Sequence, residues 1–271
     1  MHTRRILTTC FALTLALTFA AAPAGAGAGG KLRGSLERLL ERLDLSQSKR
    51  DELRALFEGH RAAVDALATR ELDARAALRD AVEKRTPDED AVTAAAASLA
   101  EVERDFALER ALIYSEVFPV LGDDQRVKLL KFVTVMEGQI AARERESALP
   151  SQRVETLKAK LPEDEQQTVD AVMAESRRPV ASAMNGLTNA RQTLTIAIHQ
   201  RRPDEGLVTE AASSSSAART RLALTAAAIW PQLLDPLNQK QRESLRKYSE
   251  SLDKAIVERH RALSLFFLDQ L

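Results

Sequence analysis

The chain has 271 residues, which is enough for one large domain or two ordinary ones. Its 39 Lys and Arg residues balance 39 Asp and Glu residues, and this neutrality excludes a nucleic-acid binder that works through bulk positive charge. Aromatic residues make up only 4% of the chain, whereas Ala, Leu, Glu and Arg are abundant, so the composition favours helices over β-sandwiches and barrels. The single Cys excludes an intrachain disulfide.

The first 28 residues have the pattern of a secretory signal peptide. Arg4 and Arg5 precede an apolar run over residues 6–22, and a stretch of small residues follows. This order of charged, apolar and small-residue regions is typical of a cleaved export signal. A retained membrane anchor is the alternative, and the run is near the lower length limit for one. We therefore predict an exported protein whose mature part has no cysteine and contains 37 basic and 39 acidic residues.

Beyond residue 34 glycine is scarce and apolar residues recur at helical spacing, so the rest is predicted to be all-α with no sheet. Thr86 is expected to cap the second long helix, with Pro87 at its first position. The first long helix would span roughly 55 Å, and we expect long antiparallel hairpins in an extended or cradle-like assembly. In chain order, the expected helices cover residues 35–43, 46–82, 87–118, 123–147, 151–160, 164–199, 203–234 and 239–271.

The second half of the chain repeats the first with an offset of 116 residues. A Pro-Asp-Glu sequence at residues 87–89 recurs at 203–205, and the same ungapped offset places Arg75 on Arg191. Shared helical periodicity alone would not keep the Pro-Asp-Glu turns aligned. We predict an internal duplication, with a signal peptide at 1–28, a first helical unit at 31–147 and a second at 150–271.

A short pattern precedes two helices in each copy: a Leu, a capping residue and, at the fifth position, a polar residue that can reach back to the cap. Its residues are Leu45, Ser46 and Lys49, then Leu121 and Gln125, Leu161 and Glu165, and Leu237 and Gln241. Four such instances in an exported helical chain resemble the LTxxQ motif of the Spy/CpxP family. The resemblance covers essentially the whole mature chain, once per copy.

This resemblance implies a function. Spy-like members are ATP-independent periplasmic chaperones that form cradle-shaped dimers, so the chain is expected to bind unfolded or misfolded exported proteins, without a cofactor. CpxP-like members damp an envelope stress sensor, which makes a membrane stress-sensor kinase another expected partner. Because related members bind metals, an envelope stress regulator or a periplasmic metal-responsive sensor is an alternative, and a structural helical adapter is another.

The resemblance also bears on assembly, because the family works as a pair of units. One chain is therefore expected to form the whole cradle as an internal pseudo-dimer, with a homodimer as the alternative.

Candidate client-binding residues are basic side chains beside the apolar stripe of the long helices, where Arg stems can cover apolar surface and reach acidic client groups. The competing interpretation is that the stripe packs inside the hairpin and the Arg residues are merely solvated. His199 and His260 lie near expected helix ends and are predicted to be solvated. The candidate residues are Arg54, His60, Arg61, Arg70, Arg75, Arg79, Arg177, Arg178 and Arg191.

No pattern indicates catalysis or a metal centre. The three histidines of the mature part are nowhere three or four residues apart, so no helix carries a two-histidine metal site. A metal site assembled between the copies stays open. The chain has no phosphate-binding glycine loop, nucleophile elbow or Ser/His/Asp signature. We expect no enzyme, no resident metal and no nucleic-acid partner.

Overall fold

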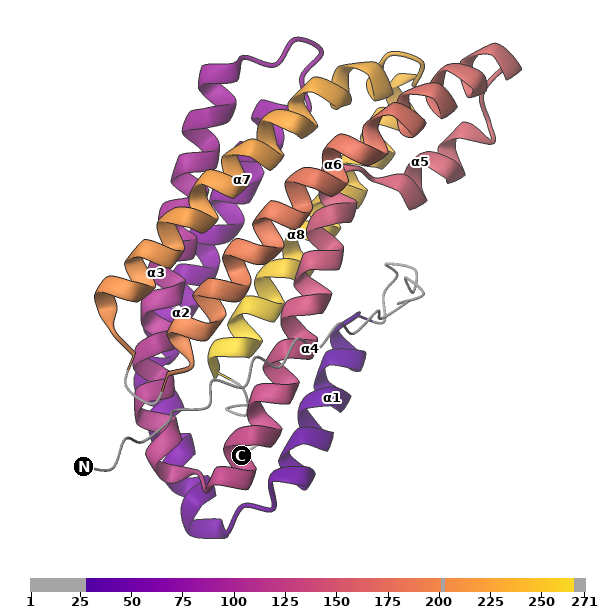
Figure 1. The fold of residues 1–271 in the computed structure, drawn as a ribbon. Helices are drawn as coiled ribbons and strands as arrows, with labels where there is room; N and C mark the ends of the chain where they lie inside the picture. Colours follow the sequence, from indigo (N-terminus) through magenta and orange to yellow (C-terminus); the bar gives the residue numbers. More distant parts are fainter. Residues whose placement is uncertain (1–27, 201–202, 266–271) are drawn as a thin grey trace, which may run out of the picture.

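The computed structural model describes residues 28–200 and 203–265, so all of the predicted signal peptide except its last residue lies outside the described residues. The described part consists of eight α-helices without a strand, arranged as an elongated bundle (Figure 1). This confirms the all-α prediction. None of the described helices is both long and apolar enough to cross a membrane.

The helices follow the order expected from the sequence. The long helices α2 and α3 form one antiparallel hairpin, and α6 and α7 form another (Figure 1). Helices α6, α7 and α8 each begin 116 residues after α2, α3 and α4, respectively. The bounds are α1 (Ala28–Leu43), α2 (Gln47–Val82), α3 (Glu89–Val120), α4 (Asp123–Ala148), α5 (Ser151–Lys158), α6 (Glu163–Ile198), α7 (Glu205–Leu234) and α8 (Gln239–Leu265).

The N-terminal caps of α3 and α7 have the same geometry. Asp88 accepts a hydrogen bond from the backbone N–H of Ala91 at 3.0 Å, and Asp204 accepts one from Leu207 at 3.0 Å. The prediction that Thr86 caps α3 was wrong, because the helix begins only at Glu89 and the Asp88 carboxylate occupies the capping position.

The first two helix-start motifs act as caps and contact each other. The Ser46 hydroxyl accepts a hydrogen bond from the backbone N–H of Lys49 at 3.4 Å. The Gln125 side-chain oxygen accepts one from the backbone N–H of Gly122 at 2.9 Å and another from the Lys49 ammonium at 3.2 Å. The start of α2 is therefore joined to the start of α4.

In the second copy only the last motif forms a capping box. Gln241 accepts a hydrogen bond from the backbone N–H of Asn238 at 2.9 Å, and Asn238 accepts one from the backbone N–H of Gln241 at 3.0 Å. At the start of α6, Pro162 has no N–H to donate and no side chain caps the helix, so Glu165 has no capping partner there. The motif leucines Leu45, Leu121, Leu161 and Leu237 are all buried.

An arginine in the first turn of α4 and an arginine in the first turn of α8 each donate a hydrogen bond to the carbonyl of a residue eight positions earlier. Arg126 Nε donates to the carbonyl oxygen of Phe118 at 2.8 Å, and Arg242 Nε donates to that of Leu234 at 2.9 Å. Both members of these pairs differ by 116 residues. Such recurrences support the predicted duplication, which stays a prediction.

The two halves pack into one body through reciprocal contacts. Helix α3 lies against α7, α8 packs on α2, α4 packs on α6, and α4 also contacts α8. This is the reciprocity that two units related by a two-fold axis show. The apolar cluster that contains Phe57 includes Ile198 of the other copy, and the cluster that contains Trp230 includes Val82. Each apolar cluster is therefore built from both halves.

Candidate functional site

A network of buried ion pairs lies between the two apolar clusters. Each of the helices α2, α4, α6 and α7 contributes apolar residues to one cluster along one part of its length and to the other cluster along another part. The charged residues of the network lie between these two parts. Opposite charges from five helices therefore meet near the centre of the molecule. The network consists of Glu71 and Arg75 of α2, Glu103 of α3, Glu144 of α4, Arg191 of α6 and Arg219 of α7.

Two carboxylates hold three arginines together. Glu144 is 2% exposed and contacts Arg75 at 3.3 Å, Arg219 at 2.7 Å and also Arg191. Glu103 contacts the same three guanidinium groups at 2.5–3.2 Å. Burial alone would raise the pKa of Glu144, but the charges of the three arginines outweigh it and hold that pKa well below its usual range. Complete pairing offsets the cost of burying these charges.

Glu71 adds a histidine to the network. This fully buried carboxylate accepts hydrogen bonds from Arg75 Nε at 2.7 Å and from His260 Nδ1 at 2.8 Å. Burial disfavours its charged form, yet the charges of His260 and Arg75 prevail and lower the pKa of Glu71 to about 2. The prediction that His260 is solvated was therefore wrong, because its ring is buried and makes a hydrogen bond with the Glu71 carboxylate.

The expectation for His199 was also wrong. This residue ends α6, where its Nδ1 lies 2.6 Å from the carbonyl oxygen of Thr195 and its ring lies edge-on against Tyr114 with centroids 4.2 Å apart. Burial lowers the pKa of His199 to about 4, so the ring is neutral at pH 7.

The network carries opposite charges at positions that the 116-residue offset makes equivalent. Glu103 corresponds to Arg219, and Glu144 corresponds to His260. Identical units would bring like side chains together near a two-fold axis, whereas here an acidic residue in one half meets a basic residue in the other. The two halves are therefore complementary rather than interchangeable.

The structure divides the predicted client-binding residues into two groups. Arg75 is buried, and the side chains of Arg79 and Arg191 are only 11% and 12% exposed. All three make ion pairs with buried carboxylates, so the prediction that they contact clients was wrong. The others are at least partly exposed, and several have an acidic neighbour. They are Arg54, Arg61, Arg70, Arg177 and Arg178.

His60 ties the first hairpin together. Its side chain is 14% exposed, with Nδ1 2.7 Å from a Glu109 carboxylate oxygen and Nε2 3.3 Å from one of Glu116. Both ring nitrogens are thus used between α2 and α3, which does not fit a client-binding role. Among the described residues, no three or more His, Cys, Asp or Glu side chains are grouped so that they could hold a metal ion.

Three large apolar side chains are about half exposed near the turn from α6 to α7, and we call them the apolar end. Ile196 is 61% exposed, Leu207 in the first turn of α7 is 47% exposed, and Leu112 of α3 is 49% exposed. The contact between Tyr114 and His199 places this part of the α3 backbone beside the end of α6, and Leu112 lies on a different face of α3 from the buried Tyr114. The equivalent positions in the other copy hold Asp80, Ala91 and Ala228.

Sequence reasoning missed the carboxylates of the network and the apolar end. Glu103 and Glu144 stand among other charged residues and look like a solvated helix face. One signal for the network was in the sequence, because the offset sets Glu103 against Arg219. For Ile196, the signal was an apolar residue at the position where the first copy has Asp80.

In a comparison with known proteins, the N-terminal part of the chain matches one family model. Residues 7–128 match the model of a family described as heavy-metal resistance. The family is one of Spy/CpxP-like helical periplasmic proteins, which confirms the resemblance drawn from the helix-start motifs. Neither a curated protein nor a solved structure matches the chain.

Proposed function

We propose that this protein is an exported, ATP-independent chaperone-like protein that binds unfolded or misfolded envelope proteins in the periplasm. The observation that carries the proposal is the apolar end, where Leu112, Ile196 and Leu207 remain about half exposed. Large apolar side chains that remain exposed are candidate contacts for a protein partner. The match of the N-terminal part to a Spy/CpxP-like family supports the same conclusion.

The size of this apolar surface fits reversible binding. Covering the exposed half of one Leu or Ile side chain contributes roughly 1 kcal/mol, so the three together contribute roughly 3 kcal/mol. Such contacts are weak enough for a client to leave without nucleotide hydrolysis, and shallow enough to accept many sequences.

One chain supplies both halves of the proposed cradle. Reciprocal packing of α2 with α8 and of α6 with α4 supports an internal pseudo-dimer, as does the opposite charge of Glu103 and Arg219. Sedimentation equilibrium of the mature protein tests this point. A mass of one chain is expected, whereas an obligate dimer with exchanged halves would contradict it.

A client aggregation assay tests the chaperone function. The mature protein is mixed at stoichiometric ratio with an unfolding client protein in the absence of ATP, and light scattering follows aggregation. We expect clear suppression. Aggregation at the rate of the client alone would overturn the proposal.

The description of the matched family favours a metal-responsive regulator as the second candidate. Titration of the mature protein with zinc, copper and nickel separates it from the first. Binding at micromolar concentration would favour the regulator and its expected partner, a membrane stress-sensor kinase. Absence of such binding would remove this candidate.

A further inference from the structure

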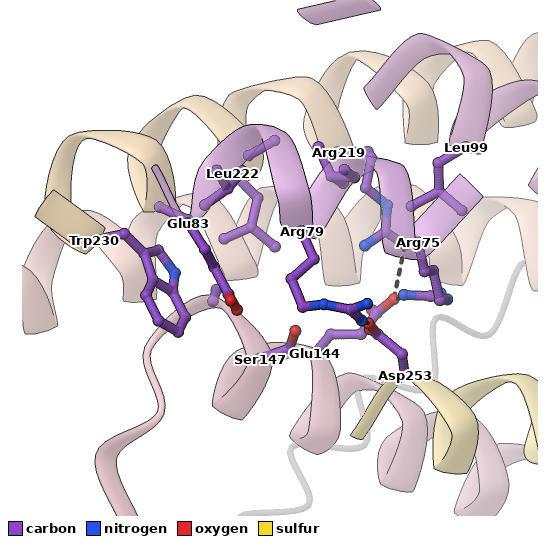
Figure 2. Close-up of a pocket in the computed structure, with 15 residues that line it drawn as sticks. Arg75, Arg79, Glu83, Leu99, Glu144, Ser147, Arg219, Leu222, Trp230 and Asp253 are labelled. Atoms are coloured by element: carbon purple, nitrogen blue, oxygen red, sulfur yellow. Dashed lines mark hydrogen bonds and ion pairs between the residues drawn. The ribbon is translucent and has the colours of Figure 1, made fainter. Parts of the chain in front are cut away.

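Two cavities occupy equivalent positions in the two halves. The first, which we call the Trp230 cavity, is bounded in part by Arg79, Leu222, Ala226, Trp230 and Asp253 (Figure 2). The second, which we call the Arg110 cavity, is lined by residues at equivalent positions. Thr195 corresponds to Arg79, Phe106 to Leu222, Arg110 to Ala226 and Glu137 to Asp253. The offset of 116 residues therefore relates the cavities as well as the helices.

The two cavities differ in how far side chains fill them. The Trp230 cavity has a volume of about 70 Å³ and the Arg110 cavity about 20 Å³. Phe106 and Arg110 occupy the space that Leu222 and Ala226 leave open in the Trp230 cavity. Arg110 pairs with Glu137 at 3.0 Å from the α3 side. In the Trp230 cavity the corresponding carboxylate, Asp253, is paired by Arg79 of α2, which leaves the α7 side free.

The open cavity is apolar on one side and polar on the other. Trp230 and Leu222 form an apolar wall, and Figure 2 shows the Glu83 carboxyl between Trp230 and Arg79. Arg79 Nε is buried and has no hydrogen-bond partner among the described residues. A buried donor without an acceptor is costly, so a ligand that supplies an acceptor would gain from it.

Glu83 can serve as a second donor. Burial raises its pKa to about 7, although the charges of Arg79 and Arg246 lower it, and the charge of Asp253 raises it further. Near neutral pH, this carboxyl therefore carries a proton in a large fraction of the molecules.

A groove with five basic and three acidic residues shares Glu83 with the cavity. Glu83 also lines this groove, whose volume is about 850 Å³ and which lies between the α2–α3 turn and the start of α8. Lys84, Arg85 and Lys240 line it and make no ion pair with the described residues. Such a groove raises the local concentration of anions. The equivalent positions of Lys84 and Lys240 hold Gln200 and Asp124.

We propose that the Trp230 cavity binds a small monocarboxylate, whose carboxylate accepts hydrogen bonds from Arg79 Nε and the Glu83 carboxyl and whose alkyl end contacts Trp230. The size of the cavity limits the ligand. The cavity is about half the size of the roughly 150 Å³ cavity that holds benzene, so it limits the ligand to a molecule smaller than benzene, such as acetate or propionate. The Arg110 cavity is too well filled for such a molecule.

Trp230 is the only tryptophan of the chain and reports on the cavity directly. Sodium propionate is titrated into the whole protein at pH 6.5, with sodium chloride at equal ionic strength as the reference. Tryptophan fluorescence and calorimetry are both recorded. We expect a saturable response to propionate that chloride does not produce, with binding several-fold tighter at pH 6 than at pH 8 because Glu83 must keep its proton. If neither measurement distinguishes propionate from chloride, the proposal is overturned.

A matched pair of variants locates the site. Leu222→Phe installs the residue that fills the Arg110 cavity and is expected to weaken propionate binding at least tenfold. Phe106→Leu makes the reverse change in the Arg110 cavity and is expected to leave the affinity within twofold of wild type. Circular dichroism confirms that both variants are folded. Unchanged binding by folded Leu222→Phe would contradict the assignment.

Discussion

The α2–α3 end and the α6–α7 end occupy equivalent places in the two halves, yet their surfaces differ. At the α6–α7 end, Ile196 and Leu207 expose large apolar side chains. The equivalent positions at the α2–α3 end hold Ala91 and Asp80, which pairs with Arg246 at 3.1 Å. Because the corresponding helices begin at the same offset, the difference lies in the side chains. One framework thus presents an apolar surface at one end and a charged groove at the other.

The interior shows the same divergence, and removing Glu144 is expected to have the largest effect. Glu144→Gln leaves three buried guanidinium groups short of a partner, which should lower the free energy of unfolding by about 3–5 kcal/mol. His260→Gln, at the equivalent position, weakens the contacts of this ring with Glu71 and Phe106 and should cost about 1–2 kcal/mol. Urea denaturation measures both. Equal losses of stability in the two variants would contradict the different roles assigned to Glu144 and His260.

The C-cap residues of α2 and α6, Glu83 and His199, are also equivalent, and they should contribute opposite pH dependences. Burial raises the pKa of Glu83 to about 7, so the stability that it contributes is lost as pH rises from about 4.5 to 7. Burial lowers the pKa of His199 to about 4, so its contribution is lost as pH falls from about 6.5 to 4. Between pH 5 and pH 7 the two contributions oppose each other in the wild-type protein.

Single substitutions should reveal each contribution. Relative to wild type, Glu83→Gln is expected to gain stability as pH rises from 5 to 7, and His199→Gln to lose it, each by up to about 2 kcal/mol. Urea denaturation at pH 5, 6 and 7 gives both slopes. Slopes of the same sign for the two variants would contradict the opposite pH dependences expected for Glu83 and His199.

The smallest loss of stability is expected when the helix caps are removed, and it should be similar in the two halves. Asp88→Ala and Asp204→Ala each remove one capping hydrogen bond of 3.0 Å and should each cost about 1 kcal/mol. Thermal denaturation compares the two variants. A marked difference between them would mean that the common framework is unequally supported in the two halves.

The helices could be predicted from the sequence because their signals are local. Apolar spacing and Pro-Asp-Glu turns placed the end of α2 at Val82 and the start of α4 at Asp123, as the structure has them. The cap of α3 was misplaced because Thr86 and Asp88 are both good capping residues. Which of the two meets the free N–H groups depends on where the helix begins.

Burial of the charged residues could not be predicted in the same way. Arg70 and Arg75 lie on the same helix and look alike in the sequence, yet Arg70 is largely exposed and Arg75 is buried. Besides Glu71 of its own helix, the carboxylates that surround Arg75 come from α3 and α4, so its burial depends on contacts between helices that are distant in the chain. In the sequence, the offset of 116 residues is the signal that allows a residue such as Arg75 to be compared with its equivalent in the other half.

The claim that clients bind at the apolar end is tested most directly by exchanging residues between the two ends. Aggregation of an unfolding client is measured with wild type, Ile196→Asp and Asp80→Ile under identical, nucleotide-free conditions. Ile196→Asp gives α6 the residue found at the equivalent position of α2, and we expect it to lose at least half of the suppression. Asp80→Ile should retain all of it. Full suppression by Ile196→Asp would contradict the account.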